Sequence, residues 1–361
     1  MKLTANLTAN REGLLTAFTL AASVVNQRHV KPILHNVMLV VEDHKLYATD
    51  GEISISYQVS GIETGSHGDA LLPLTFASIL KELDDEEIEI DLNNVATVKG
   101  SSAKFELPTA NPDEFPAVAE INGSEHRISA ANLSTLIKRT VFAAATENSR
   151  YALGSVLLEF DGKARMVATD GKRLALYETP GSGTSEGTIL LNPKSLAIVQ
   201  KILIDPDAEI IVRLSKDSAS FSTGKATVTT RLVEGRFPKY QDVFPPAAKH
   251  SVPLVVGNLA RVMRQAKILA IEDSKGVEFA FGERELRLSS KSGSGSSDVT
   301  LPIGSDAEVS ITFDPQFLID ACRVLDAESE ITLDLIDGKR AGVLRTGDYR
   351  YVVMPLTRER S

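Results

Sequence analysis

Few groups of residues in the sequence have the types and spacing that catalysis requires. Residues 183–187 read Gly-Thr-Ser-Glu-Gly and match G-x-S-x-G, the pattern that presents a serine nucleophile on a turn between a strand and a helix. Here the match lies in a loop rich in Gly, Ser and Thr after Pro180, and no strand runs directly into it. We interpret it as accidental, so Ser185→Ala is the test of any hydrolase hypothesis.

The ionisable side chains do not form a metal site or an acid–base pair. Aspartates such as Asp43 and Asp161 lie at expected turns, where local hydrogen bonding explains them better than proton transfer. The chain contains neither a P-loop nor a dinucleotide-binding fingerprint. Metal-ligand spacing is absent among the six histidines, which are His29, His35, His44, His67, His126 and His250. The sequence therefore predicts no catalytic residue, no metal and no cofactor.

A more informative pattern is a Thr-Asp-Gly turn that occurs twice. Residues 167–176 read Val-Ala-Thr-Asp-Gly-Lys-Arg-Leu-Ala-Leu, and residues 47–53 read Tyr-Ala-Thr-Asp-Gly-Glu-Ile. Asp can accept hydrogen bonds from the backbone just ahead of it and Gly tolerates positive φ, so Thr-Asp-Gly between apolar runs predicts a tight turn. Only the second copy continues with Lys172 and Arg173. We expect the shared part to be architectural and the added part to form a binding surface.

The elements around these turns repeat three times. Short amphipathic helices are expected at 73–83, 193–203 and 315–325; each window opens on proline, and the prolines recur about every 120 residues. A second helix is expected early in each repeat, at 5–25, 132–146 and 254–270, with alternating strands between the two. Each repeat is thus predicted to be an α+β domain with helices on one face of an antiparallel sheet.

The domain boundaries are expected where Pro, Gly and polar residues cluster. We predict domains at 1–120, 125–247 and 250–361. In the third repeat, Ser289–Ser297 replaces the Thr-Asp-Gly turn, and this serine-rich stretch predicts a flexible polar loop.

Composition limits the cellular context. The single cysteine, Cys322, excludes an internal disulfide and fits a reducing compartment. No apolar run approaches the roughly 20 residues that span a bilayer. Residues 14–25 imitate a signal-peptide core, but Glu12 at their edge opposes that interpretation. We expect a cytoplasmic protein that does not contact a membrane.

Charge is distributed unevenly along a chain whose net charge is −9. The six helix windows together contain ten basic and only three acidic side chains. Arg261, Arg264 and Lys267 follow one another at helical spacing, and Lys194 and Lys201 share a helix face. A basic surface on an acidic protein can meet phosphate on one side, and no stacking platform or zinc pattern indicates that base sequence is read.

Over its whole length the chain resembles the bacterial DNA polymerase III beta subunits, the sliding clamps. The resemblance rests on the three repeats, the basic helices and five specific stretches, which are Lys31–Asn36, Arg150–Leu153, Thr169–Leu174, Gly235–Tyr240 and Tyr351–Leu356. It implies three clamp-type domains, each with an antiparallel sheet outside and two helices inside, and a head-to-tail dimer that closes into a ring. It also implies a non-enzymatic processivity factor that encircles duplex DNA and slides on it without reading sequence.

The resemblance further implies a pocket between the second and third domains that binds peptides of the DNA polymerase III alpha subunit, the clamp loader and other clamp-binding-motif proteins. Carried over by motif, the pocket residues are Leu153, Thr169, Gly171, Lys172, Arg173, Leu174, Pro238, Val243, Val352, Met354, Pro355 and Leu356. The expected DNA-facing residues are Arg28, Lys138, Arg139, Arg150, Tyr151, Lys194, Lys201, Arg261, Arg264 and Lys267.

Three features depart from the family pattern. Asp242 stands where a basic residue is frequent, Ala152 replaces an aromatic residue, and residues 357–361 extend past the usual end. Two other functions stay open on the sequence alone: a three-domain scaffold that uses the same pocket without forming a ring, and an enzyme that uses Ser185.

Overall fold

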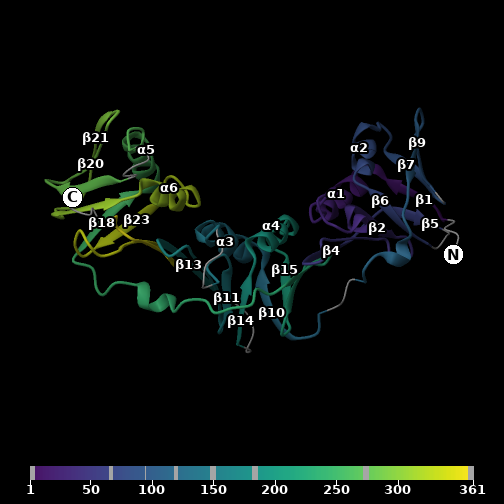
Figure 1. The fold of residues 1–361 in the computed structure, drawn as a ribbon, viewed down its shortest axis with the longest axis horizontal. Helices are drawn as coiled ribbons and strands as arrows, with labels where there is room; N and C mark the ends of the chain where they lie inside the picture. Colours follow the sequence, from purple (N-terminus) through teal and green to yellow (C-terminus); the bar gives the residue numbers. More distant parts are fainter. Residues whose placement is uncertain are drawn as a thin grey trace. The chain divides into compact units, whose positions relative to one another are not determined.

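The structure is a computed structural model that describes residues 5–64, 68–93, 95–117, 121–146, 152–180, 186–270 and 276–356 (Figure 1). The chain forms two compact units, each built from two segments. Unit 1 comprises residues 1–131 and 194–232, and unit 2 comprises residues 132–193 and 233–361. The described residues of each unit form two sheets, and every strand pair in them is antiparallel.

The larger sheet of unit 1 has the strand order β10-β15-β16-β17-β4-β3-β2-β6. In chain order its strands are β2 (Asn36–Val40), β3 (Lys45–Thr49), β4 (Ile53–Gln58), β6 (Asp69–Pro73), β10 (Ser124–Ser129), β15 (Glu209–Leu214), β16 (Ser218–Ser222) and β17 (Ala226–Arg231). The smaller sheet has the order β5-β1-β7-β8-β9. Its strands are β1 (Ala5–Asn10), β5 (Ile62–Thr64), β7 (Glu87–Leu92), β8 (Val95–Lys99) and β9 (Lys104–Pro108).

Unit 2 repeats this plan with a larger sheet in the order β14-β11-β12-β13-β25-β24-β23-β18. Its strands are β11 (Val156–Phe160), β12 (Lys163–Thr169), β13 (Arg173–Pro180), β14 (Gly187–Leu191), β18 (His250–Val255), β23 (Glu330–Leu335), β24 (Gly342–Thr346) and β25 (Tyr349–Val353). The smaller sheet has the order β21-β20-β19-β22. Its strands are β19 (Val277–Gly282), β20 (Glu285–Ser292), β21 (Gly295–Pro302) and β22 (Val309–Phe313).

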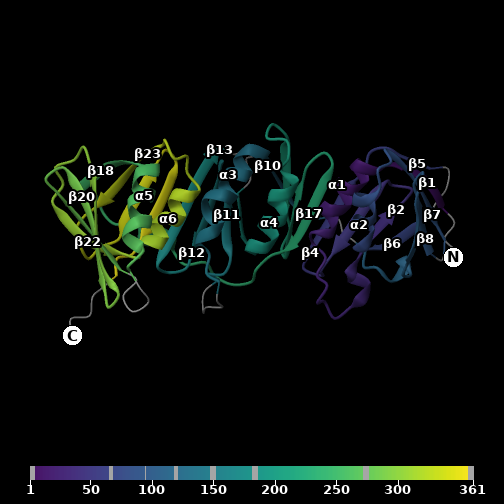
Figure 2. The ribbon, with the colours of Figure 1, turned by 90° about the horizontal axis from the view of Figure 1, so that it is seen from above.

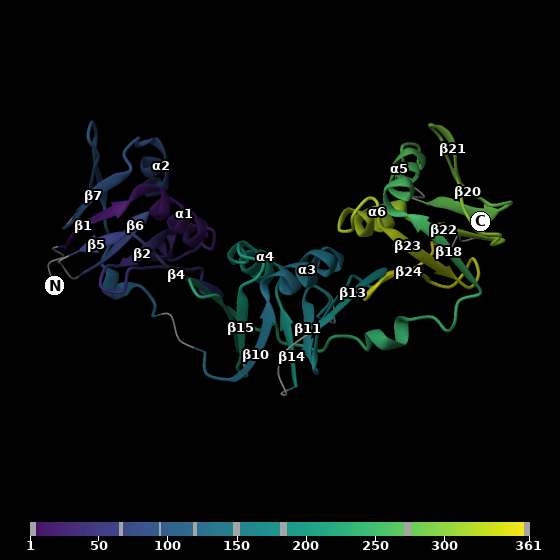
Figure 3. The ribbon, with the colours of Figure 1, turned by 180° about the vertical axis from the view of Figure 1, so that it is seen from behind.

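Two α-helices fall in each predicted repeat of the described chain, as expected. They are α1 (Arg11–Ala22), α2 (Thr75–Glu82), α3 (Ala130–Thr140), α4 (Pro193–Ile202), α5 (Val256–Lys267) and α6 (Pro315–Arg323). Short 3-10 turns are η1 (Pro32–His35), η2 (Pro112–Glu114), η3 (Val141–Ala143) and η4 (Tyr240–Val243). In the views from above and behind, α1 lies beside α2 and α5 beside α6 (Figures 2 and 3). The predicted α+β class is confirmed.

Apolar side chains between helices and sheets form the cores. In unit 1, Phe18 of α1 and Phe76 of α2 are fully buried, with ring centroids 5.0 Å apart. In unit 2, Phe279 and Phe313 meet edge to face at 5.5 Å between β19 and β22. Local capping defines where some helices begin: the side chain of Asn10 accepts from the amide of Gly13 at the start of α1.

Three predicted helix boundaries were wrong because strands precede the helices. Residues 5–10 form β1, which pairs with β7, and residues 250–255 form β18, which pairs with β23. Leu7 and Ala9 are buried in the first segment, an alternation typical of a strand rather than a helix. Pro73 ends strand β6, and helix α2 begins two residues later at Thr75.

The serine-rich stretch of the third repeat is not a flexible loop. Residues 289–297 contribute to the β20–β21 hairpin, in which Ser290 faces Ser297. The hydroxyls of both serines donate to the carbonyl of Ala266 in α5, at 3.1 and 2.9 Å. Serine is used here because its hydroxyl satisfies a helix carbonyl at a packed position, which the sequence composition concealed.

Candidate functional site

The two Thr-Asp-Gly turns stand at equivalent places in the two larger sheets. The first connects β3 to β4, and β4 pairs with β17; we call the β4–β17 pairing junction one. The second connects β12 to β13, and β13 pairs with β25; we call the β13–β25 pairing junction two. At each junction a strand from one sequence repeat is hydrogen-bonded to a strand from the next.

Both turns use the same local hydrogen bonds. In the first, the Asp50 carboxylate accepts from the amides of Glu52 and Ile53 at 3.0 and 2.8 Å. In the second, the Asp170 carboxylate accepts from the amides of Lys172 and Arg173 at 2.9 and 3.0 Å. The central glycines have φ of +88° and +85°, a conformation that L side chains rarely adopt. The architectural prediction for the shared motif is confirmed.

The two turns differ in how they are tied to the helix of the next repeat. At junction one, the second oxygen of Asp50 pairs with Lys194 of α4 at 2.5 Å. At junction two, the guanidinium of Arg173 pairs with Asp320 of α6 at 2.7 Å, and it also contacts Asp170 at 3.0 Å. In the ion pair between turn and helix, the turn therefore supplies the carboxylate at junction one, whereas the helix supplies it at junction two.

Arg173 is an internal side chain, with only 12% of it exposed. Its guanidinium also donates to the carbonyl of Phe142 and lies 4.8 Å from the centre of the Phe317 ring. Burial works against its charge, yet the hydrogen bond to Asp320 keeps the pKa of Arg173 above its ordinary value. The expectation that Arg173 adds to a binding surface therefore needs refinement, because most of its hydrogen bonds hold unit 2 together.

A cavity of about 220 Å³ lies beside junction two. The residues that line it are Leu153, Thr169, Gly171, Lys172, Arg173, Leu174, Pro238, Tyr240, Val243, Val352 and Met354. The structure thus brings together residues from β12, β13, β25 and the segment around η4, which are far apart in the chain. All except Tyr240 were named by the motif carried over from the resemblance.

The cavity floor is apolar and its rim is exposed. Leu174 and Val352, which face each other across junction two, are each 1% exposed and belong to a buried cluster that extends to Val343 of β24. At the rim, Val243 and Met354 are 40% and 43% exposed, which is high for large apolar side chains. An apolar hollow with exposed apolar edges can bury apolar side chains of a ligand.

Backbone geometry holds the wall of the cavity in place. The amide of Met354 donates to the carbonyl of Lys172 at 2.9 Å, which fixes the chain after β25 against the turn. A Cβ at Gly171 would stand 3.9 Å from Leu153, so space exists there, and positive φ is the constraint that favours glycine. The wall is therefore shaped by the turn itself.

Tyr240 is the lining residue that the sequence argument did not select. It is 5% exposed, and its hydroxyl donates to Glu159 at 2.7 Å; Arg165 in turn donates to Glu159 at 3.1 Å. Burial and the Glu159 carboxylate raise the pKa of Tyr240 to about 12. The signal was available, because Tyr240 ends the Phe-Pro-Lys-Tyr stretch that contributed to the resemblance.

Some predicted pocket residues lie elsewhere. Pro355 and Leu356 do not line the cavity, and the amide of Leu356 donates to the carbonyl of Thr312 in β22. Asp242, the first departure from the family pattern, is exposed on η4 and does not line the cavity. Residues 357–361 lie outside the described residues.

The predicted DNA-facing residues occupy different environments. Arg28, Lys138, Lys201, Arg261, Arg264 and Lys267 are exposed. The guanidinium of Arg139 is half-buried and lies 4.5 Å from the centre of the Tyr177 ring, and Lys194 is engaged by Asp50. Arg150 and Tyr151 lie outside the described residues.

Among the described residues, no three His, Cys, Asp or Glu side chains are grouped so as to hold a metal ion. Ser185 of the G-x-S-x-G match lies outside the described ranges. None of the described helices is long and apolar enough to cross a membrane.

Models of three protein-family domains match successive parts of the chain. They are the N-terminal domain of the DNA polymerase III beta subunit over residues 5–119, the central domain over residues 127–239 and the C-terminal domain over residues 241–357. The order along the chain is the order of these domains in the beta subunit. The three matches leave only short intervals and the two ends uncovered.

Similar proteins carry the same name. The chain is 30% identical over 370 residues to the beta sliding clamp of Pseudomonas putida, covering 97% of this chain and 99% of that protein, and 27% identical over 364 residues to that of Escherichia coli K12, with the same coverage. The crystal structure of a Pseudomonas aeruginosa sliding clamp bound to griselimycin is 28% identical, with a TM-score of 0.92 over 98% of this chain and 100% of that chain. The chain therefore belongs to the family of bacterial DNA polymerase III beta subunits, and its function is that of a sliding clamp in DNA replication.

Proposed function

We propose that two copies of this sliding clamp join head to tail into a ring that encircles duplex DNA and keeps the replicative polymerase on its template. Each chain would contribute three clamp domains, at residues 1–120, 125–247 and 250–361. An interface between two different surfaces closes into a ring when its rotation is correct. We propose that the protein has no enzymatic activity and that it acts in the cytoplasm, where bacterial DNA is replicated.

The charge distribution supports a DNA-facing role for the helices. Exposed basic side chains lie on α3, α4 and α5 of a chain whose net charge is −9. Contacts to phosphate oxygens are independent of sequence and allow sliding. We assign direct phosphate contacts to Lys138, Lys201, Arg261, Arg264 and Lys267. Arg28 is assigned the same role. Arg139 and Lys194 would first have to leave their protein partners.

The cavity beside junction two is proposed as the docking site for the DNA polymerase III alpha subunit, the clamp loader and other clamp-binding-motif proteins. The observation that carries this proposal is the apolar hollow itself: Leu174 and Val352 form a buried floor, and Met354 and Val243 are exposed at the rim. A short peptide with leucine and phenylalanine anchors would cover this rim on binding. The ion pair of Arg173 with Asp320 would keep the turn in the binding geometry before the ligand arrives.

Peptide binding can be tested by fluorescence anisotropy with a labelled peptide of the Gln-Leu-x-Leu-Phe type. We expect saturable binding that Leu174→Ala and Met354→Ala each weaken by at least about 1 kcal/mol, because truncating an anchor pocket removes apolar contact. Ile204→Ala is the matched control, since Ile204 is 68% exposed and lies outside the cavity. No binding by the intact protein, or equal weakening by the control, would refute the pocket assignment.

Ring formation needs a separate experiment. Sedimentation equilibrium should show a dimer, and protein loaded on nicked circular DNA should be retained through a salt wash that removes it from linear DNA. Retention on both DNA forms or on neither would favour the alternative of a three-domain scaffold that never encircles DNA.

A further inference from the structure

A second hollow lies in unit 1, on the outer face of its larger sheet. It has a volume of about 690 Å³. It is lined by Lys45, Tyr47, Ser56, Gln58, Ile121, Asn122, Arg213, Ser220, Ser222, Thr223, Gly224, Lys225, Ala226, Thr227 and Thr229. We call it the hydroxyl groove. It shares no lining residue with the cavity of unit 2. None of the pocket or DNA-facing residues that the resemblance implied lines it.

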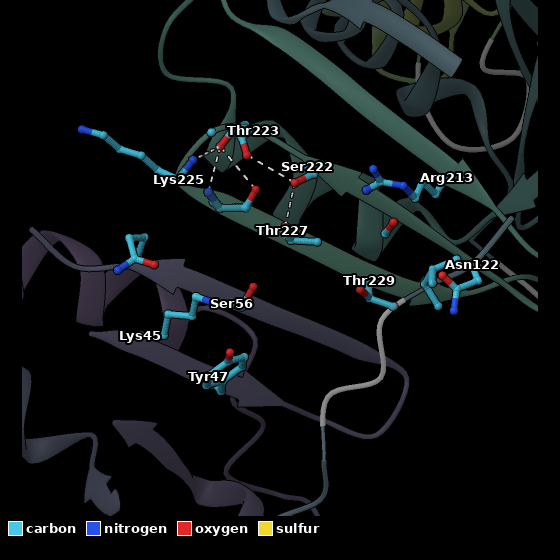
Figure 4. A pocket seen from close by; sticks show the side chains of 15 residues that line it. Lys45, Tyr47, Ser56, Asn122, Arg213, Ser222, Thr223, Lys225, Thr227 and Thr229 are labelled. Atoms are coloured by element: carbon cyan, nitrogen blue, oxygen red, sulfur yellow. Dashed lines mark hydrogen bonds between the residues drawn. The ribbon is translucent and has the colours of Figure 1, made fainter. Parts of the chain in front are cut away.

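The groove floor belongs to strands on both sides of junction one. Tyr47 of β3 pairs with Ser56 of β4, which pairs with Thr227 of β17 and so with Ser222 of β16. These side chains alternate with buried core residues such as Ile55, so they project from the face of the sheet opposite the core. Figure 4 shows Ser56, Thr227 and Thr229 along this floor.

Several hydroxyls of the floor are not used by the protein. Ser222 and Thr227 bond each other at 2.8 Å. Within the described residues, by contrast, the hydroxyls of Ser56, Ser220 and Thr229 have no hydrogen-bond partner. The floor therefore presents donors that an acceptor-rich ligand could use.

Positive charge stands at the two ends of the groove. Lys225 lies beside Gln58, whose amide donates to the Lys225 carbonyl at 2.8 Å, and Lys45 pairs with Gln58 from the other side. At the opposite end is Arg213, which also donates to Glu125 at 3.1 Å (Figure 4). Neither lysine has a carboxylate partner within the described residues.

The spacing of these ends selects the shape of the ligand. The register places Arg213 in the row of Ser54 and the two lysines in the row of Gln58. The rows are four residues apart on β4, which is roughly 13 Å along the strands at about 3.3 Å per residue. Arg213 on β15 also lies two strands from β17 and four strands from β3, which adds roughly 10 to 19 Å across the sheet at about 4.8 Å per strand. A compact anion cannot reach both ends, whereas an extended chain covers the resulting distance of roughly 16 to 23 Å in about five to seven residues. Tyr47 is the single aromatic residue of the lining, so stacking of nucleic-acid bases has little support.

We propose that the hydroxyl groove binds an extended acidic peptide segment of a protein partner, with carboxylates about five to seven residues apart. The carboxylates meet Lys45 and Lys225 at one end and Arg213 at the other, and backbone or side-chain oxygens between them accept from the floor hydroxyls. Such a contact would let a partner be held by two separate surfaces of one chain, an apolar one in unit 2 and a polar one in unit 1.

The test uses the full-length protein and the fluorescein-labelled peptide Gly-Glu-Ser-Thr-Ser-Thr-Ser-Glu-Gly, whose glutamates are six residues apart, in low-salt buffer. We expect saturable anisotropy that falls as salt is added, and we expect replacement of both glutamates by glutamine to weaken binding about tenfold or more because the charge pairs are lost. The double variant Lys45→Gln/Lys225→Gln should show a similar loss. Lys81→Gln, an exposed lysine on helix α2, is the matched control and should bind within about twofold of the unmodified protein.

Circular dichroism and the thermal midpoint show whether the double variant keeps its fold. The proposal is overturned if the acidic peptide does not bind, if the neutral peptide binds equally well, or if the double variant and the control weaken binding to the same extent. Displacement of the peptide by a single-stranded oligonucleotide of equal charge at equal concentration would also overturn it, in favour of a nucleic-acid site. Because the apolar cavity is untouched, the Gln-Leu-x-Leu-Phe titration is expected to be unchanged by Lys45→Gln/Lys225→Gln, which separates the two proposals.

Discussion

Junction one and junction two share a turn, a strand pairing and a helix tie, yet they present opposite surfaces. At junction one, Ser54 pairs with Thr229, and Thr229 pairs with Ser220. At junction two, the corresponding row joins Leu174, Val352 and Val343. One backbone plan therefore carries a polar floor in unit 1 and an apolar floor in unit 2. The shared motif therefore sets the geometry, while the side chains of one row set the polarity of the floor.

What covers the floor differs as well. Over the apolar row of junction two pack Val233, Phe237 and Phe244, from the segment that contains η4. At the polar groove of junction one, the described lining residues from the chain that precedes β10 are Ile121 and Asn122. An apolar floor without cover would expose a large hydrophobic patch, so the aromatic segment and the apolar row depend on each other.

Among the substitutions that test this comparison, a polar residue in the apolar row of junction two should have the largest effect on stability. Leu174→Ser should lower the free energy of unfolding by about 3–4 kcal/mol, because a buried apolar side chain is lost and a hydroxyl is buried in its place. Binding of the Gln-Leu-x-Leu-Phe peptide should fall by at least about tenfold in the same variant. Denaturation followed by circular dichroism is suitable, since the chain has no tryptophan.

The reciprocal change, Ser54→Leu, completes this comparison. Ser54 is half-buried and bonds Thr49 at 2.9 Å, so we expect a loss below about 1 kcal/mol. It should not create a site for the apolar peptide, because none of the described residues that line the groove is an exposed large apolar side chain like Val243 and Met354. Tight binding of that peptide to unit 1 after Ser54→Leu would show that the floor alone determines the ligand.

The ion pair between Arg173 and Asp320, which ties the turn of junction two to α6, should have the next largest effect on stability. Asp320→Ala leaves the internal guanidinium of Arg173 with Asp170 as its remaining carboxylate, and we expect a loss of about 2 kcal/mol because Asp320 is itself partly exposed. Arg323→Ala removes the exposed partner of the same aspartate and should cost less than about 0.5 kcal/mol. Equal effects of the two substitutions would contradict an internal role for Arg173.

The ion pair between Asp50 and Lys194 at junction one predicts that the stability of the protein depends on pH. Burial opposes the charge of Asp50, but the hydrogen bond from Lys194 and those from the turn amides prevail and lower its pKa. A carboxylate whose pKa is lower in the folded state stabilises the protein above its unfolded pKa near 3.9, and this contribution is lost as the pH falls through the folded pKa. Asp50→Asn should therefore reduce the loss of stability between pH 6 and pH 3. An unchanged slope would mean that Asp50 does not contribute to acid sensitivity.

Lys194→Gln should have only a small effect on stability. The lysine side chain is 53% exposed, and the Asp50 carboxylate keeps its two turn amides without it. We expect a loss below about 1 kcal/mol, in contrast to Asp320→Ala at junction two. A loss as large as that of Asp320→Ala would remove the distinction between the two ties. The same variant should lower the salt dependence of DNA binding by at most about one phosphate contact.

The sequence by itself determined the features that are local. Each Thr-Asp-Gly turn closes within five residues through its own side chains and amides, so reading the residues was sufficient to place it. Helical spacing located the six α-helices of the described residues, and the repeat of similar segments indicated three α+β domains. Most lining residues of the cavity were named by motif, since the motif residues lie in short contiguous stretches.

Tertiary structure decided what depends on distant partners. The strands before α1 and α5 were missed because their hydrogen bonds go to strands about 80 residues away, as between Leu7 and Ile90. Arg173 was expected on a surface, but its partner Asp320 is 147 residues ahead, and only the fold brings that carboxylate to it. The polarity of each row of paired residues at the two junctions likewise depends on which strands the fold makes neighbours. The chemistry of each side chain is local, whereas its use depends on what the fold packs against it.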